Sequence, residues 1–430
     1  MFVRWMRVMI CAILLIAIMG STVGAEAAGD IRIIVKLRTG ALIGPLLTLL
    51  GADLLDSIPS VNLYLLRVPH VPVLSLTLSL LGVAYIETDT TMDNPTFRNL
   101  GLLTSVAPPD FYRLQPALTL IRADKAVDYY AGYGVIVADI NSATDSSHPA
   151  LQGHVVGGFD FVQAQGPTYA LLNQSASNFL DQTASSFLDQ SGSTSVDPAT
   201  AAFLTQTASN FLDDRLPAGL ITGPSVAYGH GTMVAGLIAA VAPLAMIMPL
   251  RVFDDNGRAD VFTIAKATYY AVSHGAQVIN MSFGMNTRSR SVQDAITAAV
   301  SANVTITGSA GNANSEVPQY PAAYPQVISI GATDLYDKKA KFSNFGTFLD
   351  VTAPGVNIIS TYPGGYYVLA SGTSFSAPIV AGGAALVRSK QATGVRDAVV
   401  NGTINIDMLN PAYYGKLGKG RVDEITAIGQ

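Results

Sequence analysis

Two short motifs carry side chains that together could cleave an amide or ester bond. One reads Gly-His-Gly-Thr around His230, and the other reads Gly-Thr-Ser-Phe-Ser-Ala-Pro around Ser374. A serine hydroxyl is a weak nucleophile at neutral pH unless a base takes its proton during the attack. Histidine is the side chain whose ordinary pKa suits that exchange near neutrality. The two motifs therefore predict nucleophilic catalysis, with Ser374 as the nucleophile and His230 as the general base.

Two further motifs lie between these, and the order of all four resembles the subtilisin-like serine peptidases (the subtilases, peptidase family S8). They are Asn-Met-Ser-Phe-Gly at 280–284 and Ser-Ala-Gly-Asn at 309–312. The resemblance covers residues 31 to about 425. It implies a serine endopeptidase that hydrolyses peptides or proteins through an acyl-enzyme.

The same resemblance implies roles for residues of the two middle motifs. Asn312 would stabilise the oxyanion with its side-chain amide, and the Ser374 backbone amide would be the second donor. The backbone of the motif at 280–284 would pair with an extended peptide. The substrate-binding residues implied in this way are Ser282, Phe283 and Gly284.

The chain departs from the family at the third member of the triad, an aspartate. The family's acid stands seven residues before the pair His148-Pro149, and here that position is Asn141; the nearest carboxylate is Asp139. An asparagine that presents its NH₂ to the histidine holds the imidazole in the wrong tautomer, and in trypsin that substitution lowers turnover about 10⁴-fold. Three interpretations follow: an impaired pseudoenzyme that binds peptides or proteins, a slow but competent enzyme, or compensation by Asp139.

Compensation by Asp139 has a simple geometry. Residues i and i+2 of a strand share one face and lie about 6.6 Å apart. Asp139 could therefore lie behind Asn141, accept its NH₂ and turn the amide oxygen toward His230. We hypothesise a line of four side chains, Asp139, Asn141, His230 and Ser374. The alternative is that Asp139 binds a backbone amide or a water molecule.

The sequence indicates no required cofactor. Subtilases often bind calcium, and one ligand frequently comes from the residue after the His-Pro pair, which here is Ala150. The turn Asp-Asp-Asn at 254–256 shows fewer oxygen ligands than a hard cation needs. We expect a solvated loop there, and calcium binding, which the resemblance allows, has no further support in the sequence.

Length and composition limit the classes of protein to consider. The chain has 430 residues, of which 49% are hydrophobic and 13% charged, so it holds enough apolar material for a large core and an accessory domain. The net charge is −5 and the sequence contains no run of basic residues. Both observations argue against a nucleic-acid partner. The single cysteine is Cys11, so a mature protein without its first residues would contain no thiol.

Residues 1–27 are expected to be a secretory signal peptide. Two arginines precede the apolar run at 8–19, and the segment 20–25, which supplies small residues, follows it, so cleavage is expected near Ala25 or Ala27. The run is shorter than the roughly 20 residues that span a bilayer. We therefore expect cleavage, no stable membrane insertion afterwards, and a secreted or periplasmic protein.

Residues 28–90 are expected to form a small α/β domain. Apolar patterning predicts strands at 31–37, 61–68 and 82–87 and helices at 41–50 and 71–81. This order resembles the ferredoxin-like propeptide of subtilases, which implies a zymogen whose own propeptide first assists folding and then inhibits the enzyme. The alternative is a small N-terminal domain without inhibitory function. Residues 91–111 would be the linker where processing occurs.

Residues 112–430 are expected to form the catalytic domain. Short apolar runs at 135–138, 245–252, 278–281, 304–307 and 327–330 are typical of parallel strands covered on both faces, and helical spacing occurs at 261–274 and 291–301. The alternation predicts an α/β domain with a doubly wound, mostly parallel sheet.

One segment, 165–220, breaks this alternation with a motif that recurs every eight residues. Phe-Leu pairs stand at 179–180, 187–188, 203–204 and 211–212. On a straight helix this period would rotate the apolar stripe by about 80° per repeat, so short repeated turns are more consistent. We interpret the segment as a surface insertion. The alternative is a flap that contacts a substrate or a partner.

Overall fold

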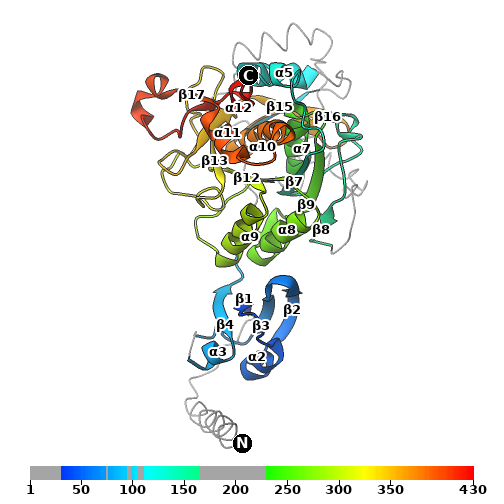
Figure 1. The fold of residues 1–430 in the computed structure, drawn as a ribbon, viewed down its shortest axis with the longest axis vertical. Coiled ribbons are helices and arrows are strands. Elements are labelled where there is room, and N and C mark those ends of the chain that lie inside the picture. Colours follow the sequence, from blue (N-terminus) through cyan, green and yellow to red (C-terminus); the bar gives the residue numbers. More distant parts are fainter. Residues whose placement is uncertain (1–30, 74–75, 94–97, 104–110, 164–228) are drawn as a thin grey trace, which may run out of the picture. The chain divides into compact units, whose positions relative to one another are not determined.

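The computed structural model describes residues 31–73, 76–93, 98–103, 111–163 and 229–430. The expected signal peptide and the eight-residue repeats at 165–220 lie outside these ranges. The chain divides after Asp89 into two compact units (Figure 1). No helix of the described ranges is long and apolar enough to cross a membrane.

The described residues of the first unit form a four-stranded antiparallel sheet with two α-helices. Its elements are β1 (Ile31–Leu37), α2 (Ile43–Leu50), β2 (Asp53–Ile58), β3 (Leu63–Val68), α3 (Leu76–Leu80) and β4 (Val83–Thr88). The strand order is β2-β3-β1-β4. Leu46 of α2 and Leu78 of α3 join alternate β1 residues, Ile33 and Val35, in one apolar cluster. The chain order is thus the β-α-β-β-α-β of a ferredoxin-like unit.

The sequence interpretation missed one strand of this unit, β2. Its sequence is Asp-Leu-Leu-Asp-Ser-Ile, with two acidic residues and a register shift between Leu54 and Asp56. Acidic residues are depleted in strands, and a bulge disrupts the alternation of side chains. β2 is also an edge strand whose first three residues are exposed, so it lacks a continuous apolar pattern.

The second unit is built on a nine-stranded sheet. Its strands are β7 (Ile136–Asn141), β8 (Phe159–Asp160), β9 (Met246–Arg251), β11 (Val278–Met281), β12 (Thr305–Ser309), β13 (Ile328–Thr333), β14 (Val351–Pro354), β17 (Thr403–Ile404) and β18 (Arg421–Val422). They lie in the order β17-β18-β14-β13-β12-β11-β7-β9-β8. Every neighbouring pair is parallel except β17 and β18. The prediction of a mostly parallel α/β fold is confirmed.

Helices cover both faces of this sheet. Figure 1 shows α7 (His230–Val241) and α10 (Thr373–Lys390) side by side on one face, and α8 (Val261–Ser273) and α9 (Arg290–Ser301) together on the other. The shorter helices are α4 (Pro116–Leu120), α5 (Ala123–Ala126), α11 (Val395–Asn401) and α12 (Glu424–Ala427).

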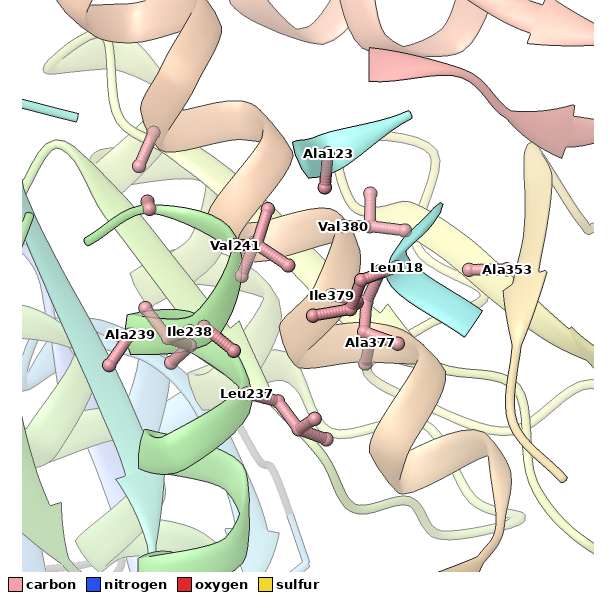
Figure 2. Packing of buried hydrophobic residues seen from close by; sticks show 14 of the residues in the cluster. Leu118, Ala123, Leu237, Ile238, Ala239, Val241, Ala353, Ala377, Ile379 and Val380 are labelled. Carbon is pink, nitrogen blue, oxygen red and sulfur yellow. The ribbon is translucent and has the colours of Figure 1, made fainter. Parts of the chain in front are cut away.

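The two helices that carry the serine and the histidine pack closely against each other. In Figure 2, Ile238 and Val241 of α7 lie in the same apolar cluster as Ile379 and Val380 of α10. A Cβ atom at Gly382 would lie 2.6 Å from the Val241 Cβ, so only glycine permits this approach. Both helices thus contribute to one apolar core.

Two short strands lie within 91–111, the segment expected to be the linker. β5 (Thr91–Asp93) pairs antiparallel with β10 (Arg258–Asp260). β6 (Arg98–Leu103) joins the hairpin of β15 (Ile358–Tyr362) and β16 (Tyr366–Ser371). An extended segment can pair its backbone N–H and C=O groups with those of an open sheet edge, which explains why these residues form strands. Met92 of β5 is buried.

Candidate active site

The candidate residues lie at the ends of three elements. Asn141 is the last residue of β7, His230 is the first residue of α7, and Ser374 is the second residue of α10. Sites in parallel sheets form at the carboxyl ends of the strands. The sheet and its two packed helices thus bring together residues that are far apart in the sequence.

The side chain of Asn141 contacts His230 through its oxygen. Asn141 Oδ1 lies 2.7 Å from His230 Nδ1 and also accepts a hydrogen bond from the Ser142 backbone amide at 2.8 Å. A backbone N–H always donates, so the amide atom that faces it must be the oxygen. The imidazole therefore carries its proton on Nδ1, and its Nε2 keeps a lone pair.

The NH₂ group of the same amide faces Asp139. Asn141 Nδ2 donates to Asp139 Oδ1 at 3.3 Å, and Asn280 Nδ2 donates to the same oxygen at 3.0 Å. Asn280 pairs directly with Asp139 across the parallel strands β11 and β7. The geometry therefore places Asp139, Asn141 and His230 in one line, and among the described residues the hydrogen-bond partners of Asp139 are side-chain amides rather than backbone groups.

Burial dominates the electrostatics of this line. Asp139 is fully buried, which raises its pKa to about 7, although the hydrogen bonds from Asn280 and Asn141 act in the opposite direction. Burial lowers the pKa of His230 to about 3. At neutral pH the imidazole is therefore the neutral form that a general base requires.

A glycine fixes the start of α7 against the loop after β7. The Gly231 backbone amide donates to Ser142 Oγ at 3.0 Å. A Cβ atom at this position would lie 2.5 Å from the Ser142 carbonyl oxygen, so a larger residue would push the helix away. The second glycine of the Gly-His-Gly motif thus holds His230 beside Asn141.

Ser374 and Ser282 exchange hydrogen bonds. Ser374 Oγ donates to the Ser282 carbonyl at 3.2 Å, and Ser282 Oγ donates to the Ser374 carbonyl at 3.0 Å. The ring of Phe375, the next residue along α10, has its centroid 6.0 Å from that of His230. Ser374 is only 1% exposed, so the hydroxyl is closed off from solvent in this structure.

Asn312 lies at the start of α10. Its Oδ1 accepts hydrogen bonds from both the backbone amide and the hydroxyl of Thr373, each at 2.9 Å. A Cβ atom at Gly372 would lie 3.4 Å from Asn312 Nδ2. The amide oxygen therefore caps the helix, and the NH₂ group lies next to the turn that leads into Ser374.

The three residues expected to bind substrate follow β11 directly. The Phe283 ring is buried and packs edge-on against Phe253, with centroids 5.5 Å apart. Its side chain belongs to the core, so only its backbone could face a peptide. Ser282 is buried as well, while Gly284 is partly exposed.

The residues considered above for calcium have other contacts in this structure. Asp254 Oδ1 accepts from the backbone amides of Asn256 and Arg258, at 2.9 and 2.8 Å. Asp255 forms an ion pair with Arg251 at 2.5 Å. Ala150 has no side-chain oxygen, and the described residues contain no cluster of three or more His, Cys, Asp or Glu arranged for a metal.

The sequence reasoning missed the contribution of Asn280. It is the first residue of the Asn-Met-Ser-Phe-Gly motif, and an asparagine inside a buried strand is the signal that could have indicated it. Its partner Asp139 is on another strand, so only the order of the sheet reveals the contact.

Comparisons with known proteins identify the family of this chain. Residues 132–410 match the model of the subtilase family, Peptidase_S8. The chain belongs to the subtilase family. This subtilase is 31% identical to thermitase from Thermoactinomyces vulgaris over 332 residues, which are 74% of this chain and 98% of thermitase. It is 40% identical to subtilisin BL from Lederbergia lenta over 171 residues, 38% of this chain and 64% of that relative.

Solved structures show the same fold. The crystal structure of fervidolysin from Fervidobacterium pennivorans, described as a keratinolytic enzyme related to subtilisin, superposes with a TM-score of 0.67. It is 22% identical, and the match covers 95% of the subtilase and 62% of fervidolysin. The prediction of a serine-type endopeptidase of the subtilase family is confirmed.

Proposed function

We propose that this subtilase hydrolyses peptide bonds with Ser374 as nucleophile, His230 as general base, and the pair Asp139–Asn141 in place of the usual aspartate. One observation carries the proposal. Asn141 presents its oxygen to His230 Nδ1 at 2.7 Å while its NH₂ is bound by Asp139. This is the orientation that gives the imidazole the tautomer needed to accept a proton from serine.

The proposed reaction uses these residues in the following order. Ser374 Oγ turns from the Ser282 carbonyl toward His230 Nε2, transfers its proton there and attacks the substrate carbonyl. The NH₂ of Asn312 and the Ser374 amide at the start of α10 stabilise the oxyanion. The imidazolium then donates its proton to the leaving amine, and water hydrolyses the acyl-enzyme with His230 again as base.

In this proposal the carboxylate of Asp139 acts on His230 indirectly, through the side chain of Asn141. A neutral amide oxygen stabilises the imidazolium less than a directly bound carboxylate does, because hydrogen bonds to charged groups are stronger. The charge of Asp139 polarises the Asn141 amide and holds its orientation. We expect the resulting turnover to lie between that of an enzyme with a direct Asp–His pair and that of one with an unsupported asparagine.

We infer that residues 28–90 are a propeptide and that the protein is an exported zymogen. One structural observation supports this, since the first unit has the ferredoxin-like order of elements. The apolar run at 8–19 supports export.

Processing tests both parts of the proposal. The full chain is expressed with its N-terminal residues, and the N-terminus of the exported protein is determined by mass spectrometry. Wild type should lose the first unit, and Ser374→Ala should retain it. Equal persistence of both precursors would favour a peptide-binding protein that hydrolyses too slowly to process itself.

A further inference from the structure

Asn280 is a fully buried amide whose polar atoms all have partners. Its Nδ2 donates to Asp139 Oδ1 at 3.0 Å and to Ser282 Oγ at 2.9 Å, and its Oδ1 accepts from Thr307 Oγ1 at 3.1 Å. Strand β11 lies between β7 and β12, which supply Asp139 and Thr307. The side chain thus bridges three neighbouring strands within the core.

The partners of Asn280 fix which way its amide points. The Thr307 hydroxyl lies closer to Asn280 Oδ1, at 3.1 Å, than to the Ile279 carbonyl, at 3.4 Å. The Ser282 hydroxyl donates its proton to the Ser374 carbonyl, so toward Asn280 it accepts. Both contacts require the NH₂ group of Asn280 to face Asp139.

We propose that Asn280 is a positioning residue for catalysis, which holds Asp139 as a carboxylate with Oδ1 placed to bind the NH₂ of Asn141. It thereby sets the tautomer of His230 through two intervening side chains. The proposal rests on the proposed function, and it assigns Asn280 a role distinct from the substrate-binding residues that follow it.

The contacts of Asp139 make this dependence strong. Both of its hydrogen bonds fall on Oδ1, and Oδ2 has no hydrogen-bond partner among the described residues. Of the two donors, Asn280 is closer than Asn141, at 3.0 against 3.3 Å. A buried carboxylate without donors takes up a proton, so removal of Asn280 favours neutral Asp139.

In the part of the chain that the structure describes, no other ionisable side chain binds Asp139. The ionisable side chains on the elements packed against β7 are His230 on α7, Arg251 on β9, Lys266, Tyr269 and Tyr270 on α8, and Arg388 and Lys390 on α10. Arg251 is paired with Asp160 and Asp255. Within the described residues none of these groups forms an ion pair with Asp139, whose pKa is set by burial and by the two amides.

The test compares kcat and KM across pH for the processed enzyme and a short chromogenic peptide amide. Asn280→Ala removes the Asn280 donor to Asp139 and leaves that of Asn141, whereas Thr307→Val leaves Asn280 in place but removes the hydroxyl that orients it. We expect Asn280→Ala to lower kcat at pH 7 about tenfold with KM unchanged, because a buried charged group loses a hydrogen bond. The midpoint of the acid limb of the kcat–pH profile should move up by about one pH unit. Thr307→Val should change both quantities in the same direction but less.

The same substitution made in a chain without Asp139 distinguishes a positioning role of Asn280 from a role in core packing. The double variant Asp139→Ala/Asn280→Ala should have the same kcat and the same pH profile as the single variant Asp139→Ala. An equal loss with and without Asp139, or an unchanged pH profile in both single variants, would overturn the proposal. If Asn280→Ala does not fold, Thr307→Val decides alone.

A spectroscopic measurement keeps the proposal independent of turnover. The ¹⁵N shifts of the His230 ring, measured in the Ser374→Ala chain with and without Thr307→Val, report the tautomer at pH 7. We expect the Nδ1–H form in the chain with Thr307 and a mixture in the variant. The same single tautomer in both would refute the role of Asn280, whereas absence of Ser374-dependent hydrolysis in wild type would refute the proposed function.

Discussion

Asn141 Oδ1 and His230 Nδ1 lie 2.7 Å apart at the place where subtilases ordinarily bring a carboxylate to the histidine. The amide oxygen gives the same tautomer as a carboxylate but no charge. The negative charge is carried by Asp139, which binds the NH₂ of Asn141 and does not contact His230. Catalysis in this subtilase is thus expected to depend on a carboxylate that does not touch the histidine.

The pH dependence of kcat should report Asp139 rather than His230. Burial raises the pKa of Asp139 to about 7, and burial lowers that of His230 to about 3. As the pH falls through about 7, Asp139 takes up a proton and loses the charge that strengthens its hydrogen bond from the NH₂ of Asn141, so kcat should fall there. Pre-steady-state and steady-state rates between pH 4 and 9 measure this limb. In Asp139→Ala the limb near pH 7 should disappear; its persistence would assign it to another group.

Exchange of the two side chains should improve the enzyme at low pH. The double variant Asp139→Asn/Asn141→Asp places the carboxylate directly on His230 and the amide behind it. Given that a misplaced amide costs about 10⁴-fold in trypsin, we expect a gain of at least about tenfold in kcat/KM at pH 5. The single variant Asn141→Asp is the control, because it places two carboxyl groups at a contact that is now 3.3 Å long, where they must share one proton. A double variant no faster than wild type would show that the direct charge is not limiting.

Removal of the Asn312 amide should lower kcat without raising KM. Its oxygen caps α10 through Thr373 and its NH₂ lies beside Gly372. For Asn312→Ala we expect a loss of about 10²–10³ in kcat, the range that removal of one such donor causes in a subtilisin. Asn312→Asp keeps the oxygen that caps the helix but removes the donor, so it should lose as much. Full activity in Asn312→Asp would mean that the oxyanion finds its donors elsewhere.

A second buried carboxyl group should affect stability rather than activity. Burial raises the pKa of Glu424 to about 8, and the neighbouring Asp423 raises it further. Below pH 4.5 the group is protonated in both states. As pH rises toward 8 the unfolded chain ionises while the folded protein keeps the proton, so the free energy of unfolding falls over this window.

Glu424→Gln removes this penalty. Its Tm should exceed that of the parent by several degrees at pH 8 and equal it at pH 4. The measurement uses the Ser374→Ala chain, in which self-digestion does not interfere. Asp397→Asn, an exposed carboxylate on α11, is the matched control and should show no such difference. Equal Tm values for Glu424→Gln and its parent at both pH values would refute the prediction.

The sequence predicted the central strands well because their apolar runs are continuous. The run predicted at 278–281 coincides with β11, and the helix predicted at 261–274 ends one residue after α8. The prediction for β7 stopped at residue 138, whereas the strand continues to Asn141. Polar residues end an apolar pattern, and Asp139 is tolerated inside the sheet only because two amides, one on its own strand and one on the neighbouring strand, bind it.

Contacts between residues on different strands could not be predicted from this sequence. The hypothesised placement of Asp139 behind Asn141 needed only the two-residue repeat of one strand. The role of Asn280 needed the parallel register that pairs it with Asp139, which no local pattern encodes. Similarly, β5 and β6 have short sequences without a strong pattern, and only open edges elsewhere in the fold make them strands.

Hydrolysis of a peptide amide by wild type, Asp139→Ala and Asp139→Asn at pH 8 tests the central claim most directly. Both variants keep Asn141, His230 and Ser374, and Asp139→Asn also keeps a side chain of the same size. If the charge of Asp139 orients the Asn141 amide, kcat should fall about 100-fold in both variants, as part of the loss expected for a wrong tautomer. Unchanged kcat in Asp139→Ala, with Ser374→Ala inactive in the same assay, would contradict the account.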